Sequence, residues 1–236
     1  FDFIMGDDVD FSMDEVVGQL TRWGRWYTEK AGLDGFRIDA VKSIDSTFFG
    51  PWLEEMGEVG RHPVFAVGEF WSGDTADLEG YLEDSGGCMR LFDVPLHFRL
   101  QHASQNPRDF DHRRLLDGTI TEERPDLSCP FVDNHDTQPG QALESWVADG
   151  FKTRAYATVL LRGAQVPFVF YGDLWGIPHD GKGPVAFLRE MVWVRSHLLG
   201  DEVVDMNDDD HQKMCWLVRG EHPVFGPSTI DALGRE

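Results

Sequence analysis

The chain has 236 residues, of which 41% are hydrophobic and 12% aromatic, a composition typical of a folded globular protein with a sizeable core. Its 42 acidic and 21 basic residues give a formal net charge of −21. Such an acidic chain repels phosphate backbones and anionic lipid, which argues against nucleic acids and membranes as partners, whereas a neutral polysaccharide is compatible with it.

In chain order, the first predicted element is a helix that begins near Ser12 and ends at Gly32. Ser12 and Glu15 have the spacing of a capping box, and apolar residues follow at helical intervals. A short strand at 34–39 and a second helix come next. The run 64–70 is almost continuously apolar, as in a strand that is covered on both faces.

Further strands are predicted at 91–94, 131–133 and 167–170, and helical or mixed segments at 74–82, 96–103, 108–116, 141–162 and 185–199. This alternation is typical of βα units around a parallel sheet. A closed (β/α)8 barrel needs eight units over roughly 250 residues, and the sequence offers about five. We therefore expect an α/β fold, a partial (β/α)8 TIM barrel comprising about the last five units, over residues 1–200. Residues 201–236, with a β-like run at 214–218, are predicted to start a C-terminal β domain that is truncated.

The cysteines and the first residue bear on the location of the protein. Cys88, Cys129 and Cys215 are far apart and form no C-x-x-C pattern, so we expect free thiols. Free thiols slightly favour a cytoplasmic over a secreted location. The sequence contains no run of about eighteen apolar residues, so no membrane span is predicted. Because the chain begins with Phe1, we expect it to be a piece of a longer protein whose true N-terminus lies upstream.

Three predicted strands end in acidic residues, at the edge where parallel α/β barrels place their active sites. Arg37 and Asp39 share a face of the first strand, and an arginine so close favours an ionised carboxylate. Glu69 ends an apolar strand, where burial would raise the pKa of its carboxyl group as suits a general acid. The third strand ends in the acidic stretch 133–136.

Each of these features also has an ordinary structural explanation. Asp39 could be a helix cap, Glu69 an ion-pair partner, and 133–136 a turn with a hydrogen-bonded histidine. Their occurrence together at three strand ends of one sheet favours an active site over three unrelated structural roles.

The segments GFRIDAVK (35–42), VGEFW (67–71) and FVDNHD (131–136) resemble the second, third and fourth conserved regions of the α-amylase family, glycoside hydrolase family thirteen. They occur in the family's order. The resemblance is closest to the liquefying bacterial-type and fungal intracellular α-amylases. It extends over roughly residues 1–200 through RWGRWYTEKAGLDGFRIDAVK, LFDVPLHF and FVFYGDLWG.

The resemblance implies endo-acting, retaining hydrolysis of α-1,4-glucosidic bonds in starch- or glycogen-type glucans. It implies that Asp39 is the nucleophile, that Glu69 is the general acid/base, and that Asp136 is a third carboxylate that stabilises the transition state. The implied substrate-binding residues are Arg37, which positions Asp39, Lys42, His135 and Trp71. A core position is an equally good explanation of Trp71.

The same resemblance implies a bound Ca2+. Asp8 matches the conserved ligand, Asp10 would belong to a second metal cluster, and Ser43 would offer a backbone carbonyl where the family usually has a histidine. Calcium takes about six to eight oxygen ligands, so further ligands would have to come from elsewhere.

The family's first conserved region and the first strands of its barrel are absent from the chain. We therefore expect the 236-residue polypeptide by itself to have little or no activity, and the full-length protein to be a monomer. Other α-glucan-active members of the family remain alternatives, namely maltooligosaccharide-forming, α-1,6-acting and transglycosylating enzymes. A non-catalytic glucan-binding homologue is a further alternative. A metal hydrolase that uses His97, His102 and His135 is disfavoured because these residues form no ligand motif.

Overall fold

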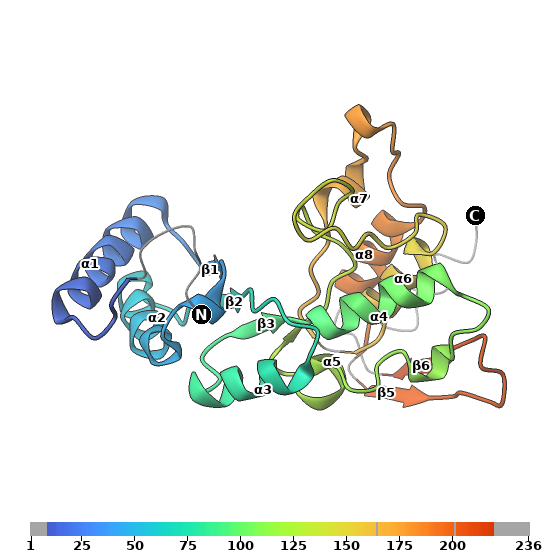
Figure 1. The fold of residues 1–236 in the computed structure, drawn as a ribbon, viewed down its shortest axis with the longest axis horizontal. Coiled ribbons are helices and arrows are strands. Elements are labelled where there is room, and N and C mark those ends of the chain that lie inside the picture. Colours follow the sequence, from blue (N-terminus) through green and yellow to red (C-terminus); the bar gives the residue numbers. More distant parts are fainter. Residues whose placement is uncertain (1–8, 164, 201, 220–236) are drawn as a thin grey trace, which may run out of the picture. The chain divides into compact units, whose positions relative to one another are not determined.

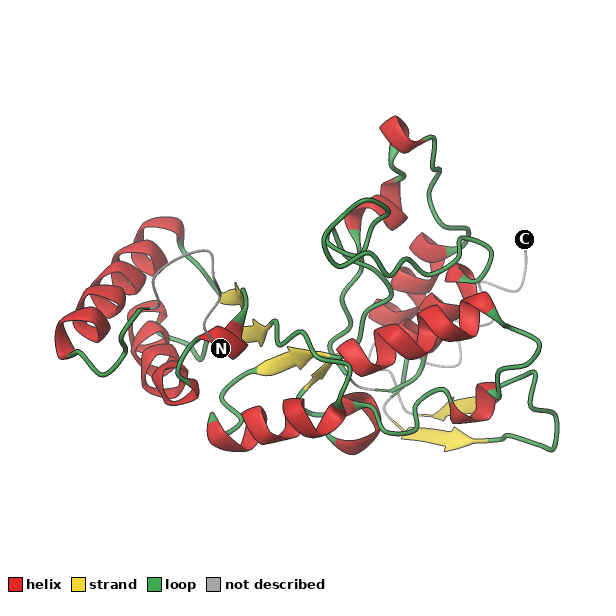
Figure 2. Ribbon diagram, viewed as in Figure 1, coloured by secondary structure: helices red, strands yellow, loops and turns green. Residues whose placement is uncertain are grey.

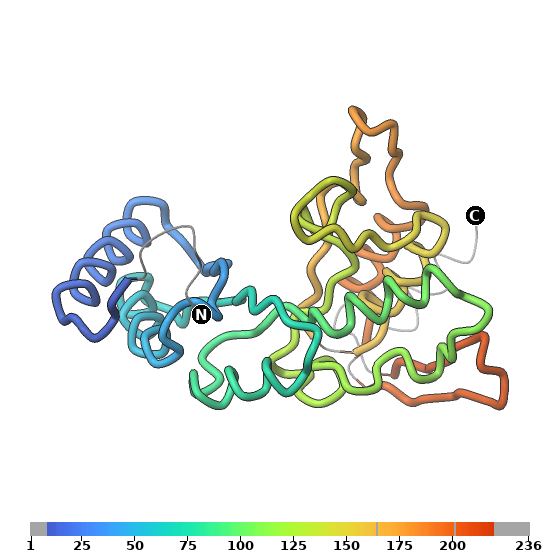
Figure 3. The backbone as a smooth tube through the Cα atoms, in the orientation of Figure 1, coloured from blue at the N-terminus to red at the C-terminus, as the bar shows by residue number. Residues whose placement is uncertain are grey.

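The computed structural model describes residues 9–163, 165–200 and 202–219. The chain divides into two compact units, residues 1–94 with 127–129 and residues 95–126 with 130–236. Figure 3 traces the backbone from the N-terminus in blue to the C-terminus in red.

The first unit is built on a parallel sheet (Figures 1 and 2). Within its described residues the strand order is β1-β2-β3-β4, and each neighbouring pair is parallel. The strands are β1 (Gly35–Ile38), β2 (Phe65–Gly68), β3 (Arg90–Phe92) and β4 (Ser128–Cys129), and the helices are α1 (Asp14–Ala31), the 3-10 helix η1 (Val41–Ser43), α2 (Ser46–Gly60) and α3 (Thr75–Asp84). Helices α2 and α3 connect consecutive parallel strands, as the βα pattern predicts.

Helix α1 ends where the sequence predicts but begins differently. Gly32 takes the left-handed conformation, with φ 64° and ψ 50°, and its amide donates to the Thr28 carbonyl. The predicted capping box is wrong, because the N-cap residue is Met13 and makes no side-chain cap bond. The Ser12 hydroxyl instead donates to the Asp10 carboxylate at 2.6 Å.

Helices α1 and α2 pack closely because α1 has a glycine, Gly24, at their contact. A Cβ atom on Gly24 would lie 2.6 Å from the Trp52 ring and 2.9 Å from the Met56 sulfur. Trp52 and Met56 are both buried, and the Trp52 indole N–H donates to the Leu20 carbonyl at 3.3 Å. The absence of a side chain at Gly24 lets the α2 side chains reach the α1 backbone.

The second unit is mainly helical. Its elements are α4 (Val94–Gln105), η2 (His112–Arg114), α5 (Ile120–Glu123), α6 (Lys152–Leu161), α7 (Tyr171–Trp175), η3 (Pro178–Asp180), α8 (Leu188–His197) and the antiparallel strands β5 (Glu202–Asp205) and β6 (Trp216–Arg219). Its core includes Leu96, Leu100, Val132, Tyr156 and Leu188. No helix in the described ranges is both long and apolar enough to cross a bilayer.

The later strands are shorter than the sequence predicts. Strand β4 ends at Cys129 because Pro130 has no N–H to continue the ladder. The predicted strand at 131–133 is therefore a non-strand segment that follows β4. The segment 167–170 is not a strand either, although the Phe168 amide donates to the Pro130 carbonyl at 2.9 Å. The predicted helical stretch 141–162 is helical only in α6, its C-terminal half.

Candidate active site

Asp39 and Glu69 follow the ends of two neighbouring parallel strands. Ile38 and Gly68 are partners in the register of β1 and β2, so the next residue of each strand lies at the same edge of the sheet. The Glu69 amide donates to the Ile38 carbonyl at 2.8 Å, which fixes this end of the ladder. The two acidic residues are thereby placed side by side at the C-terminal ends of the strands, where parallel α/β barrels have their active sites.

Arg37 contacts both carboxyl groups. Its Nη1 donates to Asp39 Oδ1, and its Nη2 lies 3.1 Å from Glu69 Oε2. The Asp39 side chain is 71% exposed, whereas that of Glu69 is only 9% exposed. One guanidinium therefore holds an exposed carboxylate and a buried carboxyl group in a fixed arrangement.

The pKa of Glu69 is raised, first because burial disfavours its charged form and second because of its interaction with the Asp39 carboxyl group. The Ala40 amide, 3.4 Å from Glu69 Oε2, and the charge of Arg37 partly oppose this rise in the pKa. A carboxyl group with a raised pKa keeps its proton to higher pH, as a general acid must.

The residues next to Asp39 and Glu69 have unusual backbone requirements: Ala40 is strained, and Gly68 is closely surrounded. Ala40 has φ 45° and ψ 43°, a left-handed conformation that is unfavourable for a residue with a Cβ atom and costs about 1–3 kcal/mol. It turns the chain so that the Val41 amide donates to the Glu69 carbonyl at 3.0 Å. A Cβ atom on Gly68 would lie 2.6 Å from the Met89 sulfur, so this position requires glycine. No pattern in the sequence predicts the left-handed conformation of Ala40.

Lys42 and Trp71 are also brought together. The Lys42 ammonium donates to the Trp71 carbonyl at 3.3 Å, and the Lys42 side chain is exposed. Trp71 is half-buried, which is compatible with either of its predicted roles. Ser43 is exposed and lines a hollow of about 770 Å³ together with Arg37 and Asp39.

The remaining walls of this hollow are mostly aromatic and aliphatic. They come from α1, β1 and α2 and include Trp23, Phe36, Phe48 and Trp52. The lining of the hollow is therefore mainly apolar, with the charged side chains of Arg37 and Asp39 as part of it.

His135 and Asp136 belong to the second unit and form a pair there. His135 Nε2 lies 3.2 Å from Asp136 Oδ2, and the two side chains are 65% and 33% exposed. The Asn134 side-chain oxygen accepts the Asp136 amide at 2.8 Å and the Thr137 amide at 3.0 Å. This local turn presents the histidine and the carboxylate at the surface of the unit.

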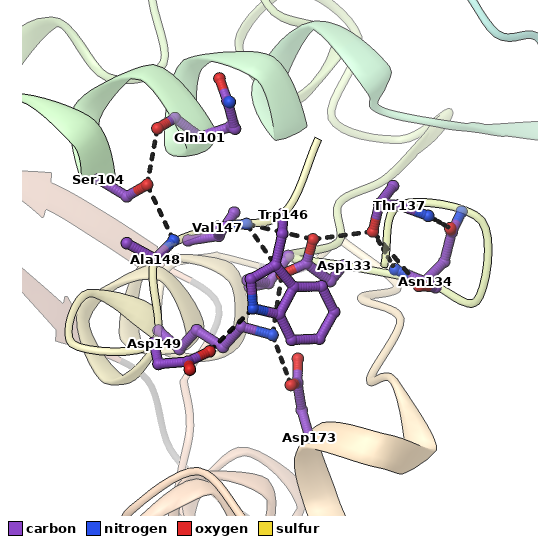
Figure 4. A network of polar contacts seen from close by, with 12 residues as sticks. Gln101, Ser104, Asp133, Asn134, Thr137, Trp146, Val147, Ala148, Asp149 and Asp173 are labelled. Carbon is purple, nitrogen blue, oxygen red and sulfur yellow. Dashed lines mark hydrogen bonds and ion pairs between the residues drawn. The ribbon is translucent and has the colours of Figure 1, made fainter. Parts of the chain in front are cut away.

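A buried ionic network lies beneath that turn (Figure 4). The Lys152 ammonium lies 2.9 Å from Asp133 Oδ2 and 2.6 Å from Asp173 Oδ1, and the Tyr156 hydroxyl donates to Asp173 at 2.7 Å. Burial raises the pKa of Asp133 to about 7, although the Lys152 charge opposes the rise. The Lys152 nitrogen also lies 3.1 Å from the centre of the Trp146 ring. Sequence reasoning named Asp133 only as a strand-end acid and missed its partners.

The predicted calcium ligands do not make a metal site in the described part of the chain. Asp8 lies outside the described residues. Asp10 is exposed, and hydrogen bonds from the Ser12 hydroxyl and amide lower the pKa of its carboxyl group. Among the residues described, no three or more His, Cys, Asp or Glu side chains are grouped to hold a metal ion. Asp10 and Ser43 offer the hard oxygen donors that calcium prefers, but far fewer than it takes.

Comparison with known proteins identifies relatives of the chain. No protein-family model matches the chain. It is 47% identical over 178 residues to the alpha-amylase of Geobacillus stearothermophilus, covering 75% of this chain and 32% of the relative. It is 45% identical over 247 residues to the glucan 1,4-alpha-maltohexaosidase of Bacillus sp. (strain 707), covering 99% and 46%. It is 42% identical over 183 residues to the cytoplasmic alpha-amylase of Escherichia coli (strain K12), covering 78% and 37%. The chain thus spans 32–46% of the length of these relatives.

Solved structures support the fold. A maltogenic alpha-amylase, AmyB from Thermotoga neapolitana, matches 90% of this chain and 52% of its own with a TM-score of 0.65 at 16% identity. An Anoxybacillus alpha-amylase matches 80% of this chain and 45% of its own with a TM-score of 0.61 at 18% identity. These neighbours are TIM-barrel proteins, which confirms the predicted partial barrel and is consistent with the β5–β6 hairpin starting a C-terminal domain. Sequence identities of 42–47% over three quarters or more of the chain, together with this fold, show that the chain belongs to the α-amylase family of glycoside hydrolases.

Proposed function

We propose that the protein to which this chain belongs is an endo-acting, retaining hydrolase of α-1,4-glucosidic bonds in starch- or glycogen-type glucans. The names of its relatives support the reaction. The observation that carries the assignment is the Arg37 guanidinium, which bridges the exposed Asp39 carboxylate and the buried Glu69 carboxyl group.

In the proposed mechanism, Asp39 attacks the anomeric carbon while Glu69 gives its proton to the departing glycosidic oxygen. The products of this step are a covalent glycosyl-enzyme on Asp39 and a glucan with a free hydroxyl group. Glu69, now a carboxylate, takes a proton from a water molecule that attacks the same carbon and releases Asp39. Two inversions at that carbon give net retention of configuration.

The interaction between the two carboxyl groups supports retention over inversion. Inverting glycosidases separate their carboxyl groups by about 6.5–9.5 Å to admit a water molecule, and retaining enzymes by only about 5–5.5 Å. Asp39 and Glu69 are close enough for Asp39 to raise the pKa of Glu69, and Arg37 bridges them directly. A direct interaction between the two carboxyl groups supports the closer spacing of retaining enzymes.

The other residues have binding roles in the proposal. Asp136 would accept hydrogen bonds from sugar hydroxyls and stabilise the positive charge of the transition state, with His135 beside it. Lys42 would contact the glucan on the reducing-end side of the cleaved bond. Trp71 would stack on a sugar ring. The exposure of His135 and Lys42 supports contact with a substrate.

Calcium, domain boundaries and location complete the proposal. The family is generally calcium-dependent, and Asp8, Asp10 and the Ser43 carbonyl would supply part of a calcium site. No catalytic step above depends on calcium.

Residues 1–200 would belong to the catalytic barrel and residues 201–236 to the start of a C-terminal β domain. The full-length protein would be a monomer. A cytoplasmic location is supported by the relative named cytoplasmic and by the free state of all three cysteines, each of which lies in the described part.

The mode of cleavage has a second candidate. One relative that aligns with 99% of this chain is named a maltohexaosidase, which favours a maltooligosaccharide-forming enzyme. Chromatography of early products from starch, pullulan and maltoheptaose separates the two. A single dominant oligosaccharide from starch at early times would replace the endo-acting proposal.

The proposal is tested with the protein expressed from its complete natural reading frame. Asp39→Asn and Glu69→Gln should each lower kcat on starch by at least about 10³-fold. The control is Asp34→Asn, because Asp34 is an acid at the opposite end of β1 whose side chain is 94% exposed. Proton NMR should show the α-anomer as the first product of a maltooligosaccharide. An initial β-anomer, or full activity of Asp39→Asn, would refute the assignment.

A further inference from the structure

A buried threonine, Thr137, anchors the turn that carries Asp136 to the interior of the unit. Thr137 is fully buried, whereas Asp136 beside it is partly exposed. The Thr137 hydroxyl donates to Asp133 Oδ1 at 2.8 Å, in the centre of the buried network of Figure 4. The Asn134 carbonyl, at 3.3 Å, is a more distant acceptor for the same proton. One hydroxyl group thus connects the turn to the interior.

The same hydroxyl oxygen also organises the turn. It accepts the Asn134 amide at 3.0 Å. The side-chain oxygen of Asn134 in turn accepts the amide of Asp136 at 2.8 Å. A continuous series of hydrogen bonds therefore leads from the Asp133 carboxylate through Thr137 and Asn134 to the backbone of Asp136.

Asp133 is a fixed point for this series. Its carboxylate is fully buried, lies 2.9 Å from the Lys152 ammonium and accepts the Val147 amide at 3.3 Å. Lys152 is held on its other side by Asp173 and by the Trp146 ring. A buried carboxyl group with this many contacts cannot shift without breaking several of them.

A second set of contacts fixes the neighbouring backbone. The buried His97 ring approaches the Val132 carbonyl at 2.6 Å and the Ser145 hydroxyl at 2.8 Å, and it stacks on Phe131. The Ser145 amide donates to the Thr137 carbonyl at 3.1 Å. The residues on both sides of the turn are therefore held, and Thr137 is the link between them.

We propose that Thr137 is a positioning residue, whose hydroxyl transmits the fixed location of Asp133 to the turn and thereby sets the orientation of Asp136 toward the glucan. This inference rests on the proposed function. A carboxylate that stabilises a transition state acts only over a narrow range of geometry, so a loosened turn should lower kcat more than it weakens substrate binding.

The test compares substitutions at Thr137 in the protein expressed from its complete reading frame. Thr137→Val keeps the shape but removes the hydroxyl, and Thr137→Ser keeps the hydroxyl. We expect Thr137→Val to lower kcat by about tenfold or more with KM within about threefold, and Thr137→Ser to retain kcat within about threefold of the wild type. Thr158→Val is the matched control, because the buried Thr158 loses only a hydrogen bond to the Arg154 carbonyl within α6. It should leave kcat within about twofold.

The assays are run well below the unfolding temperature of each variant. A kcat of Thr137→Val no lower than that of Thr158→Val would overturn the inference. If Thr137→Val does not fold, Thr137→Ala takes its place with the same expectation. Failure of both to fold, with an active Thr137→Ser, would show a purely structural role and would also overturn it. Asp136→Asn separates the two proposals, because its full activity would refute the role of Asp136 itself.

Discussion

At the scale of single residues, burial raises the pKa of Glu69, and the charge of Arg37 partly opposes that rise. Arg37 lowers the pKa of Glu69, which burial and Asp39 raise. Arg37→Met should therefore raise the pKa further, because the carboxylate loses its nearest cation. Since a general acid works only while protonated, the alkaline limb of kcat/KM should move to higher pH. The activity itself should fall by about 10²-fold, because Asp39 loses the partner that orients it.

The pH dependence of kcat/KM for Arg37→Met, measured on its residual activity, checks this shift. Arg25→Met is the control, because Arg25 forms an exposed ion pair with Glu55 in the same unit. An unchanged or lower alkaline limb for Arg37→Met would mean that Arg37 does not act on the protonation of Glu69.

The residues of the site differ in how far the sequence could predict their arrangement. Arg37 and Asp39 lie two positions apart on one strand, and Glu69 ends an apolar run, so local patterns were enough to place them on one sheet edge. Lys152 carries no such signal. At 1% exposure it depends on Asp133 and Asp173, which come from other segments, and only the packed structure joins them.

At the scale of elements, the contact of α1 with α2 depends on the missing side chain of Gly24. Gly24→Ala should destabilise the protein by about 1–2 kcal/mol, because overpacking outweighs the gain in helix propensity. Gly18 is the matched control on the same helix, since a Cβ atom there would approach only the end of the Arg22 side chain, at 3.4 Å. Gly18→Ala should stabilise by about 0.5–1 kcal/mol. Thermal unfolding of both variants measures the contrast, and equal shifts in Tm would show that the helices do not pack in this way.

The elements themselves were predictable where the spacing of apolar residues matched one type of secondary structure, or where a glycine marked the end of a helix. Strands β1 and β2, and the end of α1 at Gly32, follow the sequence pattern closely. The apolar runs near 131 and 167 did not become strands, because each contains or follows a proline that lacks the N–H a sheet needs. The capping box failed because the helix begins at Asp14, which puts Met13 rather than Ser12 at the N-cap position.

At the scale of the whole molecule, the parallel sheet of the first unit has an open edge at β1 in the described residues, and helix α1 carries exposed apolar side chains. Trp23 and Trp26 on α1 are 51% and 55% exposed, and the hollow beside β1 measures about 770 Å³. Exposed apolar surface of this kind, together with an open sheet edge, favours association of the isolated chain over a stable monomer. The net charge of −21 opposes association by electrostatic repulsion, but the apolar side chains stay exposed to water.

We therefore expect residues 1–236, expressed alone, to hydrolyse starch at less than about 1% of the rate of the protein expressed from its complete reading frame, because preorganised sites depend on their supporting scaffold. The isolated chain should also bind a hydrophobic fluorescent dye strongly and elute as a mixture of oligomers. The control is the same chain carrying Asp39→Asn, which should give an equally low rate. Strong hydrolysis by the isolated chain that disappears in Asp39→Asn would show that these strands assemble a working site without further scaffold.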